Sequence, residues 1–316
     1  MKPVTLQTLA GTMDVWCAPV IEGHIPHGDM PGDKVEISET HIHKAQVIFP
    51  PLVQLAARAA EKDNKVVIAV CGGSGVGKSE TASLLCHYFR TAGVGAYTLS
   101  GDNYPRRIPM YNDAERLRIF RTGGIRGMLK SGVYTEEYGC ELRSLWESDA
   151  DADPKTAQSR PWLAVYQTAG RAALTNYLGT DLEQDYEELS DIISRFHKGE
   201  ERIWLKRMGR TQDALWYDEV DFSGVQVLII EWTHGNNDRL RGVDVPVLLN
   251  STPEETRAHR RARNRDGHVD SPFTTMVLEI EQKELHSCAH KAKLILSKDG
   301  KMLSYEEYCA LMDGQL

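Results

Sequence analysis

The sequence lacks the features that mark membrane, secreted and nucleic-acid-binding proteins. No apolar run approaches the roughly 20 residues that a membrane-spanning helix needs, and the residues after Met1 contain no signal-peptide core. The six cysteines are scattered without a C-x-x-C pair, which fits reduced thiols in a cytosol. A formal net charge of −8 argues against nucleic acid as the main ligand. We therefore expect a cytoplasmic protein with no membrane and no nucleic-acid partner.

Repeats and low-complexity tracts are also absent, and what is present indicates an α/β protein. The 316 residues are 41% hydrophobic, enough for one large domain with or without an appendage. We expect a main domain over residues 51–316, with a helical insertion over about 105–222 that could cover a substrate. Residues 1–50 are expected to be a strand-rich extension, because Lys34–Ile37 and Gln46–Phe49 look extended. This extension is either a flap or a contact in a homodimer.

Prolines and glycines divide the chain into these parts. Pro50-Pro51 is expected to end the extension, and a helix over Leu52–Lys62 then leads to the first buried strand. Gly123-Gly124 is expected to stop a helix that starts at Asn112.

The stretch from Val66 to Ser79 carries the clearest functional signal. An apolar, β-branched run from Val66 to Cys71 predicts a strand buried on both faces, and a helix follows from Glu80. Between them lies the pattern G-x-x-x-x-G-K-[ST], formed by Gly72, Gly73, Ser74, Gly75, Val76, Gly77, Lys78 and Ser79. Glycines let successive backbone N–H groups surround an anion, and the helix N-terminus adds a favourable dipole. A chance glycine-rich turn would not need this context, so we predict a nucleotide-phosphate site.

Carboxylates at two strand ends extend this site. Lys78 is expected to reach the β and γ phosphates, while the Ser79 hydroxyl ligates Mg²⁺. Asp102 follows a short predicted strand, and Glu231 ends an apolar strand that starts at Val225. Ligands gather at the carboxyl ends of strands in an open α/β sheet. We therefore expect Asp102 to face the γ phosphate and Glu231 to ligate Mg²⁺ or water. The alternatives are a turn or capping role for the aspartate and an incidental strand end for the glutamate.

An arginine-rich helix follows the next predicted strand. Its arginines are Arg257, Arg260, Arg261, Arg263 and Arg265. Above a phosphate site, such a helix can stabilise charge on a transferring phosphoryl group, and Arg260 and Arg263 are the candidates for this role. The alternatives are a solvated basic helix or an RNA-binding strip.

Candidate acceptor-binding residues lie after Asp102 and near the end of the insertion. They are Tyr104, Arg106, Arg107, Lys206 and Arg207. The four basic residues suggest an acceptor that bears a carboxylate or phosphate. The alternative for Arg106 and Arg107 is a solvated position.

Histidines offer two partial metal sites. His41 and His43 would share one face of a strand, and a helix would bring His286, Cys288 and His290 near one another. Neither set supplies a complete group of ligands, so solvated or backbone-paired side chains are the simpler interpretation.

Several of these elements together resemble a known family. In order they are the phosphate loop, the strand end Leu99–Asp102, a helical insert, the strand end Ile229–Glu231 and the helical pattern Thr256–Arg261. This series resembles the uridine kinase and phosphoribulokinase family over about residues 64–300, and it is also similar to bacterial pantothenate kinases.

The resemblance implies a P-loop NTPase fold, a parallel sheet flanked by helices, with ATP and Mg²⁺ as cofactors. It implies that Asp102 is the base toward the acceptor hydroxyl and lies near the metal, and that Glu231 belongs to the Mg²⁺ shell. It also implies that the arginines of the Thr256–Arg261 pattern belong to a lid.

The sequence departs from uridine kinases around the acceptor. Those enzymes carry a Tyr-Asp and a following His after the insert, where this chain has Ile203–Leu205 followed by Lys206 and Arg207. Glu231 is followed by Trp232 instead of Gly, and the insertion is larger. These differences argue against uridine as the acceptor.

The expected function is an ATP- and Mg²⁺-dependent kinase that phosphorylates a hydroxyl group of a small molecule. One alternative is a nucleotide-driven switch or metallochaperone acting on a protein partner. A GTPase of that kind would carry the guanine-binding motif Asn-Lys-x-Asp. Ser297–Asp299 matches this motif only poorly, which argues against a GTPase. The other alternative is a phosphate-binding module without turnover, which would have no need of a base such as Asp102.

Overall fold

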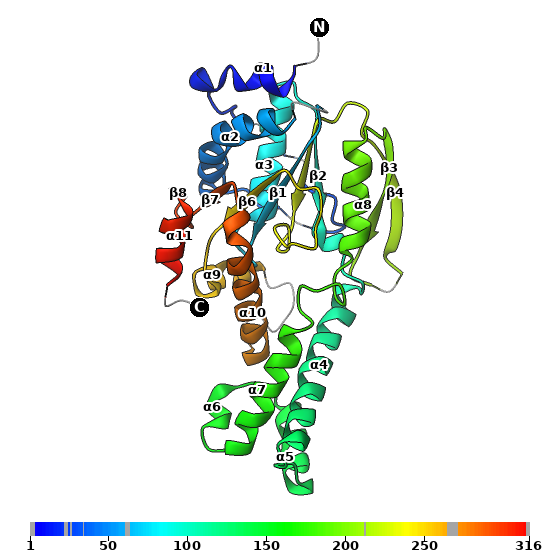
Figure 1. The fold of residues 1–316 in the computed structure, drawn as a ribbon, viewed down its shortest axis with the longest axis vertical. Helices are drawn as coiled ribbons and strands as arrows, with labels where there is room; N and C mark the ends of the chain where they lie inside the picture. Colours follow the sequence, from blue (N-terminus) through cyan, green and yellow to red (C-terminus); the bar gives the residue numbers. More distant parts are fainter. Residues whose placement is uncertain are drawn as a thin grey trace.

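A mostly parallel β-sheet forms the centre of the molecule (Figure 1). The computed structural model describes residues 4–21, 25, 27–33, 35–60, 64–211, 213–263 and 271–313, with the side chains of residues 259 and 261–263 left out. In this part of the chain the sheet strands are β1 (Val66–Gly72), β2 (Ala96–Ser100), β5 (Val227–Glu231), β6 (Val245–Leu249), β7 (Leu294–Leu296) and β8 (Met302–Leu303). Their order is β2-β5-β1-β6-β7-β8, and only β8 is antiparallel to its neighbour.

Helices cover both faces of this sheet. Alternate residues of β1, such as Ile68, pack with α1 (Leu6–Ala10), α2 (Glu39–Ala59) and α3 (Lys78–Thr91). Val67 points to the other face, where it packs with α8 (Tyr186–His197). Burial on both faces explains why β1 is apolar throughout. The predicted α/β fold with a parallel sheet between helices is confirmed.

The insertion contains a helical arm that extends away from the sheet, at the bottom of Figure 1. Its helices are α4 (Pro109–Lys130), α5 (Glu136–Glu147), α6 (Pro154–Ala157) and α7 (Pro161–Thr175). The arm has its own apolar core, which includes Phe120 and Tyr166 and also takes in Val277 of α10 (Pro272–Cys288). Helix α10 therefore connects the arm to the body.

A hairpin follows α8 and was not predicted. Strand β3 (Arg202–Met208) pairs antiparallel with β4 (Leu215–Asp221), with Arg207 opposite Trp216. The insertion over residues 105–222 is thus helical only up to this hairpin. The remaining elements are α9 (Pro253–Arg263), after β6, and α11 (Tyr305–Met312) near the C-terminus. No helix among the described residues is long and apolar enough to cross a membrane.

The expectation of a strand-rich extension is wrong. Among the described residues of 1–50 there is no strand, and Gln46–Phe49 lies inside α2. This helix continues through Pro50-Pro51, because its apolar side chains recur at helical spacing and are buried against the sheet. Burial of that face outweighs the two backbone hydrogen bonds that the prolines cannot make. His41 and His43 are therefore on a helix, not on a strand.

Gly123-Gly124 does not stop a helix either, because α4 runs through both residues. A Cβ at Gly124 would lie 2.4 Å from the ring of Tyr166, and one at Gly123 would lie 2.3 Å from Ala173. The glycines allow α4 and α7 to approach closely. Their role is helix packing, and the cost of glycine within the helix is offset by that contact.

Candidate active site

The phosphate loop connects the central strand β1 to α3. Gly75 and Gly77 have φ values of +79° and +92°, a conformation that favours glycine. Lys78 begins α3, and its Nζ donates to the carbonyl of Gly73 at 3.1 Å. The loop thus has the backbone form that the sequence motif predicts, with its lysine folded over it.

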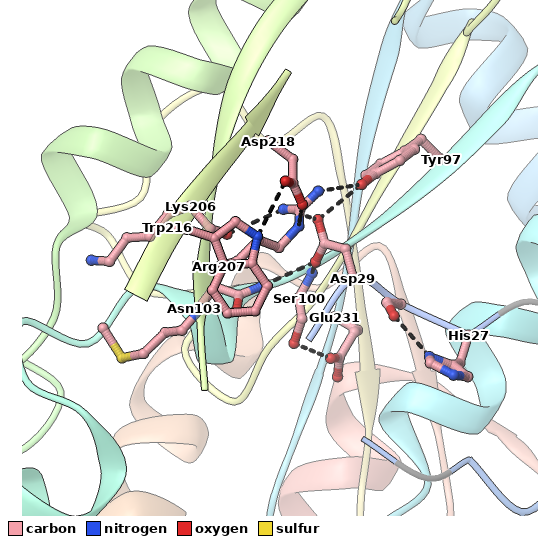
Figure 2. A network of polar contacts seen from close by, with 12 residues as sticks. His27, Asp29, Tyr97, Ser100, Asn103, Lys206, Arg207, Trp216, Asp218 and Glu231 are labelled. Carbon is pink, nitrogen blue, oxygen red and sulfur yellow. Dashed lines mark hydrogen bonds and ion pairs between the residues drawn. The ribbon is translucent and has the colours of Figure 1, made fainter. Parts of the chain in front are cut away.

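Glu231 lies beside this loop because β5 is the neighbour of β1. Its Oε2 accepts a hydrogen bond from the hydroxyl of Ser79 at 3.0 Å. Its Oε1 accepts a hydrogen bond from the hydroxyl of Ser100, the last residue of β2 (Figure 2). Parallel register explains the meeting, since Glu231 pairs with Val70 of β1 and with Ser100 of β2. The carboxyl ends of three strands therefore converge on one carboxylate.

The environment of Glu231 fits a cation. The residue is 3% exposed, and burial raises the pKa of its carboxyl to about 8, with a further contribution from the charge of Asp102. Its two hydrogen bonds come from neutral hydroxyl groups. Mg²⁺ prefers oxygen ligands and commonly takes one or two carboxylates with substrate phosphates. Ser79, Glu231 and Asp102 supply oxygens of this kind.

Asp102 lies in a short turn directly after β2. The turn spans Gly101–Asn103, and the carboxylate of Asp102 is exposed. Among the described residues the Asp102 carboxylate makes no hydrogen bond or ion pair, although its charge acts on Glu231. A Cβ at Gly101 would lie 2.1 Å from Trp232, so the indole ring packs directly on this turn. The tryptophan that replaces the expected glycine therefore supports the backbone that carries Asp102.

Arg260 is the described arginine of α9 that lies against the phosphate loop. A Cβ at Gly75 would be 3.0 Å from its Cγ, while its Nη1 donates to Pro253 at 2.7 Å and to Thr256 at 2.5 Å. The side chain of Arg263, the other predicted catalytic arginine, lies outside the described residues, as does that of Arg261. Arg265 is also outside them.

The predicted basic acceptor residues are paired with groups of the protein itself. Arg106 binds Asp185 at 3.0 Å, Arg107 approaches Glu115 at 3.7 Å, and Lys206 approaches Glu188 at 3.6 Å. Arg207 forms ion pairs with Asp29 at 2.9 Å and Asp218 at 3.1 Å. The structure thus differs from the expected cationic acceptor site, because each charge already has a carboxylate partner.

Tyr104, the fifth predicted acceptor residue, is buried. It is 0% exposed, and Lys206 Nζ lies 5.6 Å from the centre of its ring. Burial also raises the pKa of its hydroxyl. In this structure the side chain supports the turn and the hairpin.

Two cavities flank the phosphate loop, and sequence reasoning located neither. The arm-side cavity has a volume of about 490 Å³ between the loop, α4 and α10, and its lining includes Ser74, Asp113, Arg116, Asp151, Phe273 and Glu281. The α2-side cavity, also about 490 Å³, is lined by His41, Lys44, Val76, Thr256, Lys298 and Asp299, among others. Each combines residues that are far apart in the sequence, so no local pattern marks them. Among the described residues no group of three or more His, Cys, Asp or Glu side chains is placed to hold a metal ion. The two partial histidine sites considered from the sequence are therefore not completed by other ligands in this part of the chain.

Comparisons with known proteins find a relative in sequence. No family model matches the chain. The chain is 39% identical over 245 residues, 78% of its length, to the bifunctional alpha-galactosidase/sucrose kinase AgaSK of Mediterraneibacter gnavus. It spans only about a fifth of that protein's length, 21%.

Two solved structures are also similar, at low identity. A possible uridine kinase from Bacillus stearothermophilus is 14% identical with a TM-score of 0.40, covering 78% of this chain and 98% of its own. D-glycerate 3-kinase from Cryptococcus neoformans var. grubii is 12% identical with a TM-score of 0.48, covering 84% and 98%. In sequence the chain is thus similar to a protein whose name includes a sucrose kinase. This similarity agrees with the resemblance to kinases that the sequence motifs indicate.

Proposed function

We propose that this protein is an ATP- and Mg²⁺-dependent kinase that transfers the γ-phosphoryl group to a hydroxyl of a small molecule. The observation that carries the proposal is the hydrogen bond from Ser79 to the buried Glu231, with Asp102 at the next strand end. This joins a phosphate loop to two carboxylates, one buried and one exposed. The six free cysteines fit reduced thiols, so we expect the enzyme to work in the cytoplasm.

The nucleotide fits the phosphate loop and the α2-side cavity. The triphosphate would lie on the backbone N–H groups of Gly72–Ser79 and at the N-terminus of α3. The α2-side cavity begins at Gly75 and Val76 of this loop, so the nucleoside would extend into it. Lys298 and Asp299 offer a cation and an acceptor there.

The residues around Glu231 would hold Mg²⁺. When bound, the ion neutralises charge on the phosphate oxygens. The hydroxyl of Ser79 and the carboxylate of Glu231 would hold it, with Asp102 on its acceptor side. Lys78 and Arg260 would add positive charge around the phosphates.

Asp102 is the proposed base. Its exposed carboxylate is free to accept the proton of the acceptor hydroxyl, which the buried Glu231 is not placed to do. Such a group contributes about 10²–10⁴-fold to a rate. Positioning and charge neutralisation supply most of the remainder in phosphoryl transfer.

The arm-side cavity is the proposed acceptor site, and an uncharged sugar is the proposed acceptor class. Its carboxylates Asp113 and Glu281 approach Arg116 only at 3.8 and 3.6 Å and can accept hydrogen bonds from sugar hydroxyls, and Phe273 offers a ring face. The pairing of the basic acceptor candidates also favours a neutral molecule. The 39% identity to a protein named as a sucrose kinase makes sucrose the first candidate.

An ADP-release assay with ATP and Mg²⁺ tests the proposal. Sucrose, other sugars, polyols, nucleosides, pantothenate and hydroxy acids would be added in separate pools. We expect the sugar pool to raise ADP release, and Asp102→Asn to lower that rise by about 10²–10⁴-fold. If no pool raises ADP release and Asp102→Asn leaves the basal ATP hydrolysis unchanged, the proposal is contradicted and a nucleotide-driven switch is favoured.

A further inference from the structure

Asp29 connects the N-terminal segment to the carboxyl end of β2 (Figure 2). Its side chain is 9% exposed. Oδ1 accepts hydrogen bonds from the backbone N–H of Ser100 at 2.7 Å and the side-chain amide of Asn103 at 3.1 Å. Oδ2 accepts from the hydroxyl of Tyr97 at 3.0 Å and from Nη1 of Arg207 at 2.9 Å. Each oxygen thus receives two donors, so the carboxylate is held from four directions.

Two of these donors bracket Asp102 in the chain. Ser100 precedes Asp102 by two residues, and Asn103 follows it directly. The side-chain oxygen of Asn103 also accepts the backbone N–H of Met208 at 3.0 Å, which ties the turn to β3. The backbone around Asp102 is therefore fixed on both sides, while its own carboxylate remains exposed.

The same segment reaches the candidate metal site. Ser100, whose N–H is bound by Asp29, donates its hydroxyl to Glu231. A Cβ at Gly28 would lie 3.9 Å from Oε1 of Glu231 and 3.5 Å from Cγ2 of Thr98. The N-terminal segment thus forms one wall of a site whose other parts come from the sheet and its loops.

Arg207 compensates the charge of Asp29 inside this wall. Burial raises the pKa of Asp29 above its ordinary value, and Arg207, the N–H of Ser100 and the hydroxyl of Tyr97 offset only part of that rise. With a guanidinium and three further donors converging on it, the carboxylate has the partners of an ionised group. Removing its charge would leave Arg207 with the more exposed Asp218 alone.

We propose that Asp29 is a positioning residue that holds the turn bearing Asp102 in the geometry that phosphoryl transfer requires. The inference rests on the proposed function, because it needs Asp102 to act as the base. Asp29 would act through Asp102 and touch no reacting atom. Its contribution should therefore vanish once Asp102 can no longer accept a proton.

A double-mutant cycle tests this dependence. Asp29→Asn keeps the size of the side chain, but loses its charge and turns one acceptor oxygen into a donor. We expect it to lower kcat about 10- to 100-fold, the cost of misplacing a catalytic group by about 1 Å, with the KM for ATP nearly unchanged. In an Asp102→Asn background the same change should cost nothing further.

Asp218→Asn is the matched control. Asp218 also pairs with Arg207, but its side chain is 52% exposed and it contacts none of the donors on β2 or its turn. We expect kcat to stay at the wild-type value. A similar loss in Asp29→Asn and Asp218→Asn would overturn the proposal, as would an equal loss from Asp29→Asn with and without Asp102.

Hydrogen exchange separates this proposal from the proposed function. We expect Asp29→Asn, but not Asp218→Asn, to speed amide exchange in residues 97–104, because the N–H of Ser100 loses a charged acceptor. Unchanged exchange would overturn the positioning role whatever the activity. Faster exchange in a protein whose wild type phosphorylates no acceptor would show that Asp29 holds the turn structurally, and would reject the proposed function and the catalytic inference together.

Discussion

Two buried clusters, one around Glu231 at the strand ends and one around Glu183 at the root of the arm, where it pairs with Arg116 of α4, differ in how the charge is balanced. At the strand ends, Glu231 is buried against two hydroxyl groups. At the root of the arm, Glu183 is 0% exposed but pairs with Arg116 at 2.5 Å and accepts hydrogen bonds from Asn112 and the N–H of Gly179. Accordingly the pKa of Glu231 is raised by burial. Burial also acts to raise the pKa of Glu183, but Arg116, His234 and the N–H of Gly179 together outweigh it and lower that pKa.

The comparison distinguishes a site from a scaffold. Burying a charge is costly unless it is paired. The hydrogen bonds of Glu231 come from neutral hydroxyl groups, and Lys78 offsets only part of the rise in its pKa, which indicates room for a further cation. A buried carboxylate that already has a guanidinium indicates a structural joint, here between α4, residues 179–183 and α10. Isosteric changes at the two glutamates should therefore have opposite consequences.

The largest effect is expected at the strand ends. Glu231→Gln removes a proposed Mg²⁺ ligand while keeping the side-chain shape, so kcat for acceptor phosphorylation should fall about 10²–10³-fold. The measurement is steady-state ADP release over a range of Mg²⁺ concentrations. A variant with wild-type kcat and wild-type dependence on Mg²⁺ would show that Glu231 is not a Mg²⁺ ligand.

The next effect is on stability, at the root of the arm. Glu183→Gln leaves Arg116 with only Glu281, at 3.6 Å, and Asp113, at 3.8 Å, as carboxylate partners. The free energy of unfolding should fall by about 3 kcal/mol, because a buried pair has lost one partner. Denaturant unfolding measures this change. Because Arg116 also lines the proposed acceptor cavity, the KM for ATP is the activity control, and it should be unchanged below the transition. A loss of kcat without a loss of stability would contradict the structural role.

A smaller loss of stability is expected where the arm packs. Gly124→Ala places a methyl group 2.4 Å from the ring of Tyr166, and overpacking of this kind costs about 1–3 kcal/mol. The midpoint of thermal unfolding should fall accordingly. Gly224→Ala is the control, because a Cβ there meets nothing within 4 Å. Equal midpoints for the two variants would show that α4 and α7 can separate without cost.

The smallest effect is a dependence of stability on pH at the arm root. Burial lowers the pKa of His234, but Glu284, which accepts its Nδ1–H at 3.2 Å, and two further glutamates raise it overall. A histidine pKa above its unfolded value of 6.5 stabilises the fold fully below that pH, and the contribution is lost as pH rises through the folded pKa. His234→Gln should therefore flatten the fall in stability above pH 6.5, compared with the exposed control His290→Gln. Identical slopes in the two variants would exclude a stabilising charge on His234.

The sequence was sufficient to predict the sheet and the part of the site that follows directly from it. The pattern Gly72–Ser79 and the apolar strand ending at Glu231 are local signals, and parallel topology alone brings the two together. The helical spacing of apolar residues also predicts α2. Pro50-Pro51 indicates a break at the same place, and here the apolar spacing was the correct signal.

The rest of the site depends on contacts between distant residues. Asp29 is 71 residues from Ser100 and 178 from Arg207, and nothing around it in the chain is periodic. The basic residues Arg106 and Lys206 looked available for a ligand because their partners, Asp185 and Glu188, lie in other elements. Single-sequence patterns predict a side chain's type and spacing, but not its partner across the fold.

Thermal unfolding with and without Mg²⁺ and ATP, in wild type, Glu231→Gln and Glu183→Gln, tests the contrast between the two clusters most directly. A ligand that binds the folded state raises its stability. We predict that Glu231→Gln without ligand unfolds at or above the wild-type midpoint and loses the rise due to Mg²⁺, while Glu183→Gln unfolds at a lower midpoint and keeps that rise. A lower midpoint for Glu231→Gln together with an intact response to Mg²⁺ would contradict the account.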